Sequence, residues 1–103
     1  MARNKRQIPP AHPGEILDEE FLQPLNMTIN ALALALRVPS NRLYAIVQGE
    51  RGISPDTALR LGRYFGTGPE FWINLQAHYD LESTRGDLEE EVERQVQPRG
   101  HAA

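Results

Sequence analysis

Apolar residues in the middle of the chain recur at helical spacing in two short runs. The positions are Leu32, Ala35 and Leu36 in the first run and Leu43, Ile46 and Val47 in the second. Val38 and Pro39 interrupt the pattern between them. The stretch from Ala31 to Gly49 therefore predicts two short helices, joined by a tight turn and folded back on each other over a common apolar face.

The second of these helices should point a mixed set of polar, aromatic and small side chains outward. They are Ser40, Asn41, Tyr44, Ala45 and Gln48. Side chains of this kind suit the base edges in the major groove of DNA. We predict that Ser40, Asn41, Tyr44 and Ala45 read bases, and packing at the edge of the core is the alternative role for Tyr44.

Helix signals elsewhere predict an all-α chain of five helices. The expected ranges are 15–22, 28–36, 40–48, 54–65 and 69–81. Thr28 and Ser54 are favourable N-cap residues, and Pro55 stands at the first position of the helix that Ser54 caps. Pro39 is expected at the cap position of the helix over 40–48.

The composition narrows the class of protein. A chain of 103 residues is long enough for one domain with an ordinary core. The absence of cysteine excludes disulfides and thiolate metal sites, and it is typical of a reducing compartment. No apolar run approaches the roughly 20 residues that span a bilayer. We therefore expect a soluble, cytoplasmic protein with no membrane association.

The formal net charge of −3 is unusual for a nucleic-acid binder, but the charges are unevenly distributed. The basic residues in the middle of the chain are Arg37, Arg42, Arg51, Arg60 and Arg63, set against Glu50 and Asp56. Acidic residues are concentrated between Asp80 and Glu93. A basic centre and an acidic end are compatible with DNA binding and with a second, positively charged partner.

No arrangement of residues typical of catalysis is present. The serines stand in helix-cap or loop contexts without a nucleophile motif, and the three histidines are isolated. His78, Asp80 and Glu82 follow one another at a two-residue step, which scatters them around a helix and gives poor metal-ligand geometry. We predict a binding protein without a cofactor or a metal, rather than an enzyme.

The two ends of the chain differ from the middle. Residues 1–11 contain three cations and little apolar surface, which predicts a flexible basic arm, either a solubilising tail or a contact to phosphate or the minor groove. Residues 12–82 form the predicted domain. After a predicted break at Gly86, the acidic tail over 83–103 carries a narrow apolar stripe at i, i+4 and i+8: Leu88, Val92 and Val96. This tail is expected to be disordered, to form a short helix that docks on a second subunit, or to fold onto a partner.

Several motifs occur in fixed order between His12 and Leu81. They are His-Pro-Gly-Glu-Ile-Leu from His12, Ala-Leu-Ala-Leu-Ala-Leu-Arg-Val-Pro-Ser-Asn-Arg-Leu from Ala31, Gly-Glu-Arg-Gly-Ile-Ser-Pro-Asp-Thr-Ala-Leu-Arg-Leu from Gly49 and Gly-Pro-Glu-Phe-Trp-Ile-Asn-Leu-Gln from Gly68. Together they resemble the HigA antitoxin family of helix-turn-helix proteins over about two thirds of the chain. The resemblance implies a compact, lambda-repressor-like helix-turn-helix fold. The chain departs from the family in having Arg37 at the usual turn glycine and Gly68 at a usual capping serine.

The resemblance also implies a function. Such an antitoxin binds a HigB-type mRNA-cleaving toxin and represses its own operon by binding a palindromic operator as a homodimer. The alternative is a stand-alone helix-turn-helix repressor with no toxin partner. For the dimer we favour the fifth helix, with Phe71, Trp72 and Tyr79, over the apolar stripe of the tail. Burial in the core is the alternative role for Phe71 and Trp72.

Toxins of this type are generally basic, so an acidic surface should meet them. The candidates are the first helix, with Glu15, Asp18, Glu19 and Glu20, and the tail from Asp80 to Val96. We favour the tail, because a disordered acidic segment with a sparse apolar stripe suits wrapping around a basic protein.

Contacts to the DNA backbone are expected from Thr28, Arg42 and Arg51. The first-turn N–H groups of the helix that Thr28 caps can meet a phosphate. In this fold the loop with Arg51 and the N–H groups of Gly52 and Ile53 normally touches the backbone, so Arg51 is our main phosphate contact.

Arg42 has two possible roles. It lies in the first turn of the helix over 40–48, from which it can reach a guanine or a phosphate. It can also pair with a carboxylate such as Asp56 or Glu20 and hold the domain together. We favour the DNA contact.

Overall fold

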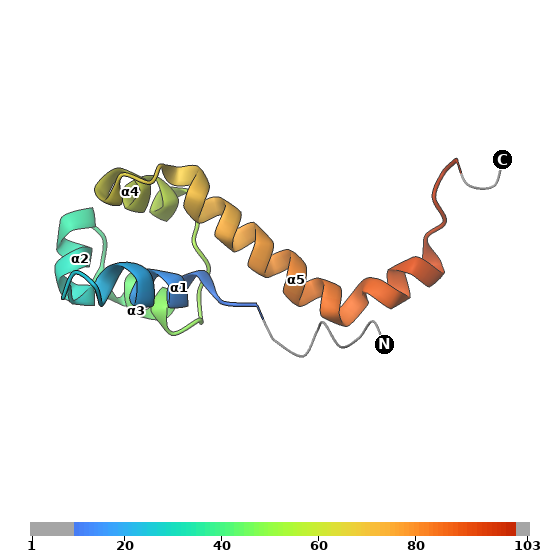
Figure 1. The fold of residues 1–103 in the computed structure, drawn as a ribbon, viewed down its shortest axis with the longest axis horizontal. Helices are drawn as coiled ribbons and strands as arrows, with labels where there is room; N and C mark the ends of the chain where they lie inside the picture. The colour runs from blue at the N-terminus through green and yellow to red at the C-terminus, as the bar shows by residue number, and fades with distance from the viewer. Residues whose placement is uncertain (1–9, 101–103) are drawn as a thin grey trace.

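The computed structural model describes residues 10–100, and helices follow one another through that part of the chain without a strand (Figure 1). They are α1 (Pro13–Ile16), η2 (Leu17–Leu22), α2 (Ile29–Leu36), α3 (Ser40–Val47), α4 (Pro55–Phe65) and α5 (Pro69–Gln95). Because α1 continues directly into the π-helical segment η2, the two form one helix, and the predicted all-α fold of five helices is confirmed. The predicted basic arm lies almost entirely outside the described residues.

Side-chain caps fix where three of the helices begin. Thr28 Oγ1 accepts a hydrogen bond from the backbone N–H of Ala31 at 3.0 Å. Ser54 Oγ does the same for Thr57 at 3.3 Å. His12, which is isolated in the sequence, caps α1 because its Nδ1 accepts from the backbone N–H of Gly14 at 2.9 Å. The first helix therefore begins two residues before the predicted start.

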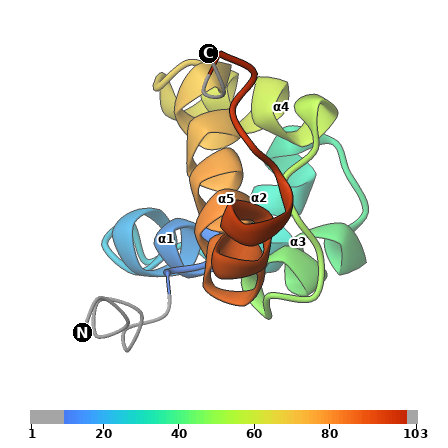
Figure 2. The ribbon, with the colours of Figure 1, turned by 90° about the vertical axis from the view of Figure 1, so that its right-hand side faces the viewer.

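The core lies between the other helices and the first turns of α5, which packs mainly against α4 and α1, and Figure 2 shows α1 and α4 on different sides of that helix. The large side chains that are almost completely buried are Leu17, Leu22, Leu32, Leu43, Ile46, Leu61 and Trp72. The Trp72 indole N–H donates to Thr67 Oγ1 at 2.9 Å, and its ring packs against Phe21 with centroids 5.0 Å apart. The expectation that Trp72 lies at a dimer surface is therefore corrected, since none of its surface is exposed.

Two glycines let neighbouring segments approach backbone to backbone. A Cβ atom on Gly14 would collide with the carbonyl group of Ile46, so α1 lies directly against the end of α3. A Cβ atom on Gly62 would collide with the backbone of Gly68 and Pro69, where α5 begins. The Gly14 contact thus packs α1 against the end of α3, and the Gly62 contact packs α4 against the start of α5.

The helix α5 differs most from the prediction. It continues to Gln95, whereas the sequence predicted an end at Leu81 and a break at Gly86. Arg85 pairs with Glu82 at 3.0 Å and with Glu89 at 3.4 Å, and such pairs stabilise successive turns across the glycine.

The second half of α5 projects from the rest of the molecule, and the helix bends within this projecting part (Figure 1). The molecule is consequently elongated, with extents of 57 × 27 × 21 Å. We call residues 81–96 the distal arm.

Candidate nucleic-acid interface

The four residues predicted to read bases lie together on α3. Ser40 and Tyr44, and likewise Asn41 and Ala45, are one turn apart and therefore adjacent on the helix surface. Asn41 and Tyr44 are exposed, whereas Ser40 and Ala45 are partly buried. Elsewhere on the same helix, the side chains of Leu43 and Ile46 are 0% exposed. The core thus anchors α3 and leaves this polar face open.

The turn between α2 and α3 keeps a left-handed residue although it has no glycine. Arg37 has φ 62° and ψ 45°, and its N–H donates to the carbonyl oxygen of Leu34 at 3.3 Å. A residue with a Cβ atom in this conformation costs about 1–2 kcal/mol. The Arg37 side chain is exposed, so the turn carries a cation just before α3 instead of a flexible glycine.

Arg42 takes part in an ion-pair network behind the turn. Its Nη1 donates to Asp56 Oδ1 at 3.0 Å, and Arg60 Nε donates to the same oxygen at 2.8 Å. The Arg60 Nη1 also donates to the carbonyl oxygen of Leu36, at the end of α2, at 2.9 Å. Hydrogen bonds from Arg60 and then Arg42 lower the pKa of Asp56 below its ordinary value. Of the two roles considered for Arg42, the structure contains the ion pair with Asp56, and the network joins α2, α3 and α4.

The loop between α3 and α4 is tied to α5 by one side chain. Gln76 Oε1 accepts from the backbone N–H of Ile53 at 2.7 Å, and Gln76 Nε2 donates to Asp80 Oδ1 at 3.0 Å. The expectation that the Ile53 N–H faces a phosphate is wrong, because this hydrogen is already donated to Gln76. Arg51 itself is exposed at the surface of the loop.

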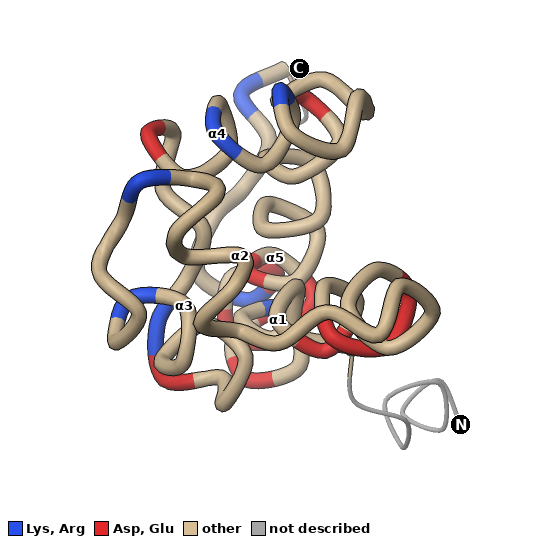
Figure 3. Tube along the Cα trace, turned by 90° about the vertical axis from the view of Figure 1, so that its left-hand side faces the viewer, with Lys and Arg blue, Asp and Glu red and all other residues tan. Residues whose placement is uncertain are grey.

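Charge separates the α3 side of the molecule from the η2 side. Figure 3 shows arginines beside α3 and at the end of α2, while the acidic residues of η2 gather on the other side. Thr28 is exposed at the start of α2, and its hydroxyl retains a proton to donate while its oxygen caps the helix. The α3 side therefore combines donors and cations suited to a phosphate backbone.

The remaining residues predicted for a dimer differ from each other in exposure. Phe71 is 38% exposed and packs edge-on against the buried ring of Trp72. Tyr79 is half-buried because it packs edge-on against His12, with ring centroids 4.9 Å apart. Burial lowers the pKa of His12, and the nearby carboxylates of Asp80 and Glu15 oppose that shift.

Sequence reasoning missed Arg60 and Gln76 as residues that support this interface. The spacing of Asp56 and Arg60 at i and i+4 was a usable signal for their ion pair. Gln76 has no such signal, because its partner Ile53 lies on a different element.

Within residues 10–100, no helix is long and apolar enough to cross a membrane. In the same range, no group of three or more metal-ligating side chains is placed to hold a metal ion.

The fold and the exposed face of α3 define a helix-turn-helix domain, and the comparisons with known proteins agree. Residues 19–72 match the helix-turn-helix family. The chain is 49% identical over 83 residues to virulence-associated protein I of Dichelobacter nodosus, an alignment that covers 81% of this chain and 77% of that protein.

Two solved structures are also similar to the chain. An addiction module antidote protein of the HigA family from Coxiella burnetii has a TM-score of 0.84 at 47% identity, covering 88% of this chain and 99% of that one. The Pseudomonas aeruginosa antitoxin HigA with the higBA promoter has a TM-score of 0.84 at 44% identity, covering 87% and 98%. The chain belongs to the HigA-type antitoxin family of helix-turn-helix proteins.

Proposed function

We propose that the protein is an antitoxin with two partners. It binds a palindromic operator as a homodimer and represses its own operon, and it neutralises a HigB-type mRNA-cleaving toxin. The exposed polar face of α3, anchored by Leu43 and Ile46, carries the DNA part of the proposal. The similarity to an antitoxin HigA whose structure includes the higBA promoter supports it further. Both activities are binding activities and need no catalytic group.

On the operator, Ser40, Asn41, Tyr44 and Ala45 read base edges. Thr28 and Arg51 contact the backbone. Arg42 does so through the guanidinium donors that Asp56 does not use, because arginine has five donors in a planar fork. Asp56 then orients Arg42 as well as joining the helices.

A homodimer is needed because one helix reads too few bases to select a site. The two copies of α3 would lie about 34–36 Å apart, one turn of DNA. Of the residues first expected at the dimer surface, Phe71 and Tyr79 remain available on α5.

The sequence favours the tail as the toxin site on the expectation that it is disordered, but the tail is helical to Gln95. We therefore assign the toxin contact to the acidic side of the first helix instead. Glu15, Glu19 and Glu20 are exposed, and the η2 acids lie on the side away from α3. A basic toxin bound there leaves the α3 face open to the operator. The distal arm is the other acidic candidate.

Co-expression with the neighbouring reading frame tests the proposal. The wild-type chain should rescue growth and co-purify with the toxic product. The variant Glu19→Lys/Glu20→Lys should lose rescue and still bind the operator, while the control Glu90→Lys/Glu91→Lys in the distal arm should keep rescue. Absence of any toxic neighbour or co-purifying protein would favour the stand-alone repressor.

A further inference from the structure

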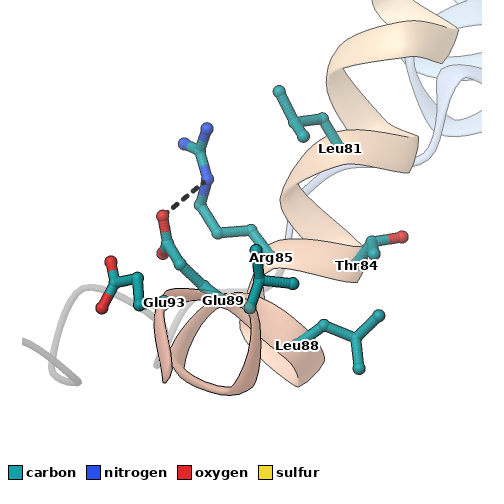
Figure 4. A pocket seen from close by; sticks show the side chains of 7 residues that line it. Leu81, Thr84, Arg85, Leu88, Glu89 and Glu93 are labelled. Atoms are coloured by element: carbon teal, nitrogen blue, oxygen red, sulfur yellow. Dashed lines mark ion pairs between the residues drawn. The ribbon is translucent and has the colours of Figure 1, made fainter. Parts of the chain in front are cut away.

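The distal arm exposes an apolar stripe on an acidic helix. Leu81, Leu88, Val92 and Val96 are 53%, 44%, 48% and 62% exposed. Leu81, Leu88 and Val92 border a shallow hollow at the bend of α5. Figure 4 shows Leu81 before the bend, Glu93 after it and the Arg85–Glu89 ion pair between them. From Glu82 to Gln95 the arm has six acidic and two basic residues, a net formal charge of −4. A partner that is both apolar and basic would complement such a surface.

A surface with those properties lies at the opposite end of the same molecule, where α2 and α4 face solvent (Figure 1). Leu34, Leu59 and Tyr64 are 77%, 61% and 46% exposed. Leu59 and Tyr64 border a second hollow, whose rim carries Arg60 and Arg63. Among the described residues Arg63 has no ion-pair partner, and neither has Glu93 on the arm. We call this second surface the basic α2–α4 face.

We propose that the distal arm of one copy docks on the basic α2–α4 face of a second copy, and that the second copy returns the same contact. This inference rests on the proposed homodimer, and it assigns the dimer contact to these two surfaces instead of Phe71 and Tyr79. A chain 57 Å long that carries its two complementary surfaces at opposite ends cannot join them within one molecule, but two antiparallel copies can. The contact occurs twice, so it closes under two-fold symmetry as a dimer interface must.

Charge decides between this arrangement and pairing of two arms. Two distal arms side by side would place two helices of net formal charge −4 against each other. An arm on the basic α2–α4 face instead places Glu93 and its acidic neighbours near Arg60 and Arg63. Apolar burial is available in both arrangements, because every surface involved has exposed leucines. Only the arm-to-face contact adds electrostatic attraction to it.

A charge swap tests the contact, with the dimer dissociation constant measured by sedimentation equilibrium on the full chain alone. Arg63→Glu and Glu93→Arg should each raise that constant roughly tenfold or more, since like charges then face each other. The double variant should restore it to within about threefold, because the pair is again of opposite sign. Glu19→Arg, on η2, is the matched control and should leave it unchanged.

Leu59→Ser and Leu88→Ser provide a second test that does not depend on charge. Each should weaken the dimer, while circular dichroism and thermal unfolding of the monomer should report an intact helical fold. The arm-to-face contact would be overturned if both single charge variants had the dimer dissociation constant of the wild type, or if the double variant did not restore it. Either result would leave the proposed homodimer standing. A wild-type chain that stays monomeric and engages its arm only with the co-expressed toxin would overturn both.

Discussion

The helix-turn-helix core and the distal arm are built from the same kinds of residue but are stabilised differently. In the core, Trp72, Leu43 and Ile46 are fully buried, and capping side chains begin three of the helices. In the distal arm the apolar side chains remain about half exposed, and ion pairs of Arg85 with Glu82 and Glu89 support the helix. The core is held by its own chain, whereas the arm is a helix that presents an interaction surface.

Truncation of a side chain in each region should show this difference most strongly. Trp72→Ala should lower the free energy of unfolding by about 3–5 kcal/mol, because it removes a buried ring and leaves a cavity. Val92→Ala in the distal arm should change it by no more than about 0.5 kcal/mol in the monomer. Urea unfolding of dilute samples measures both values. Equal losses for the two variants would contradict the division into core and arm.

On the core side, the proposed reading of bases depends on single side chains of α3. Asn41→Ala should lose roughly 1–3 kcal/mol of binding free energy on the cognate operator and relax the preference at one base pair. Operator titrations with each base pair substituted in turn would measure this. Glu20→Lys, on the acidic side of the first helix, should leave the pattern of base preference unchanged. If Asn41→Ala binds cognate and random duplexes like the wild type, the assigned face is wrong.

Arg51 should behave differently from Asn41, because a phosphate contact carries no sequence information. Arg51→Ala is expected to weaken binding to all duplexes about equally, and to reduce the slope of log K against log salt by about 0.9. Titrations at several salt concentrations measure that slope. A loss confined to one base position would instead assign Arg51 to base reading.

The smallest expected effect lies at the junction of α1 and α5. Burial lowers the pKa of His12 below its ordinary value of 6.5, so the unfolded chain takes up the proton first as the pH falls. The stabilisation by the neutral cap is fully present above pH 6.5 and is lost as the pH drops from there toward the lowered pKa.

His12→Asn keeps a capping oxygen without a titrating ring. Stability measured between pH 7.5 and pH 5 should therefore fall more steeply for the wild type than for this variant. Parallel curves would remove His12 from the pH dependence.

The sequence predicted the core well because its signals are local. Thr28 and Ser54 cap the expected helices, and Arg37 adopts the left-handed turn in place of the usual glycine. The prediction from the sequence failed where a residue contacts another part of the chain that is distant in sequence, or where its role depends on a partner. Gln76 reaches Ile53 from another helix, and Trp72 is enclosed by rings that only the folded chain brings together. In the distal arm, Gly86 suggested a break, but neighbouring helix formers and the Arg85 ion pairs outweigh one glycine.

Sequence-specific binding to the DNA upstream of its own reading frame is the central claim, and one titration tests it directly. Fluorescence anisotropy would compare a labelled duplex carrying the palindrome of that region with a shuffled duplex of the same composition, both near physiological salt. We predict that the full chain binds the palindrome at least about 10³-fold more tightly than the shuffled duplex. Equal affinity for the two duplexes would contradict the account.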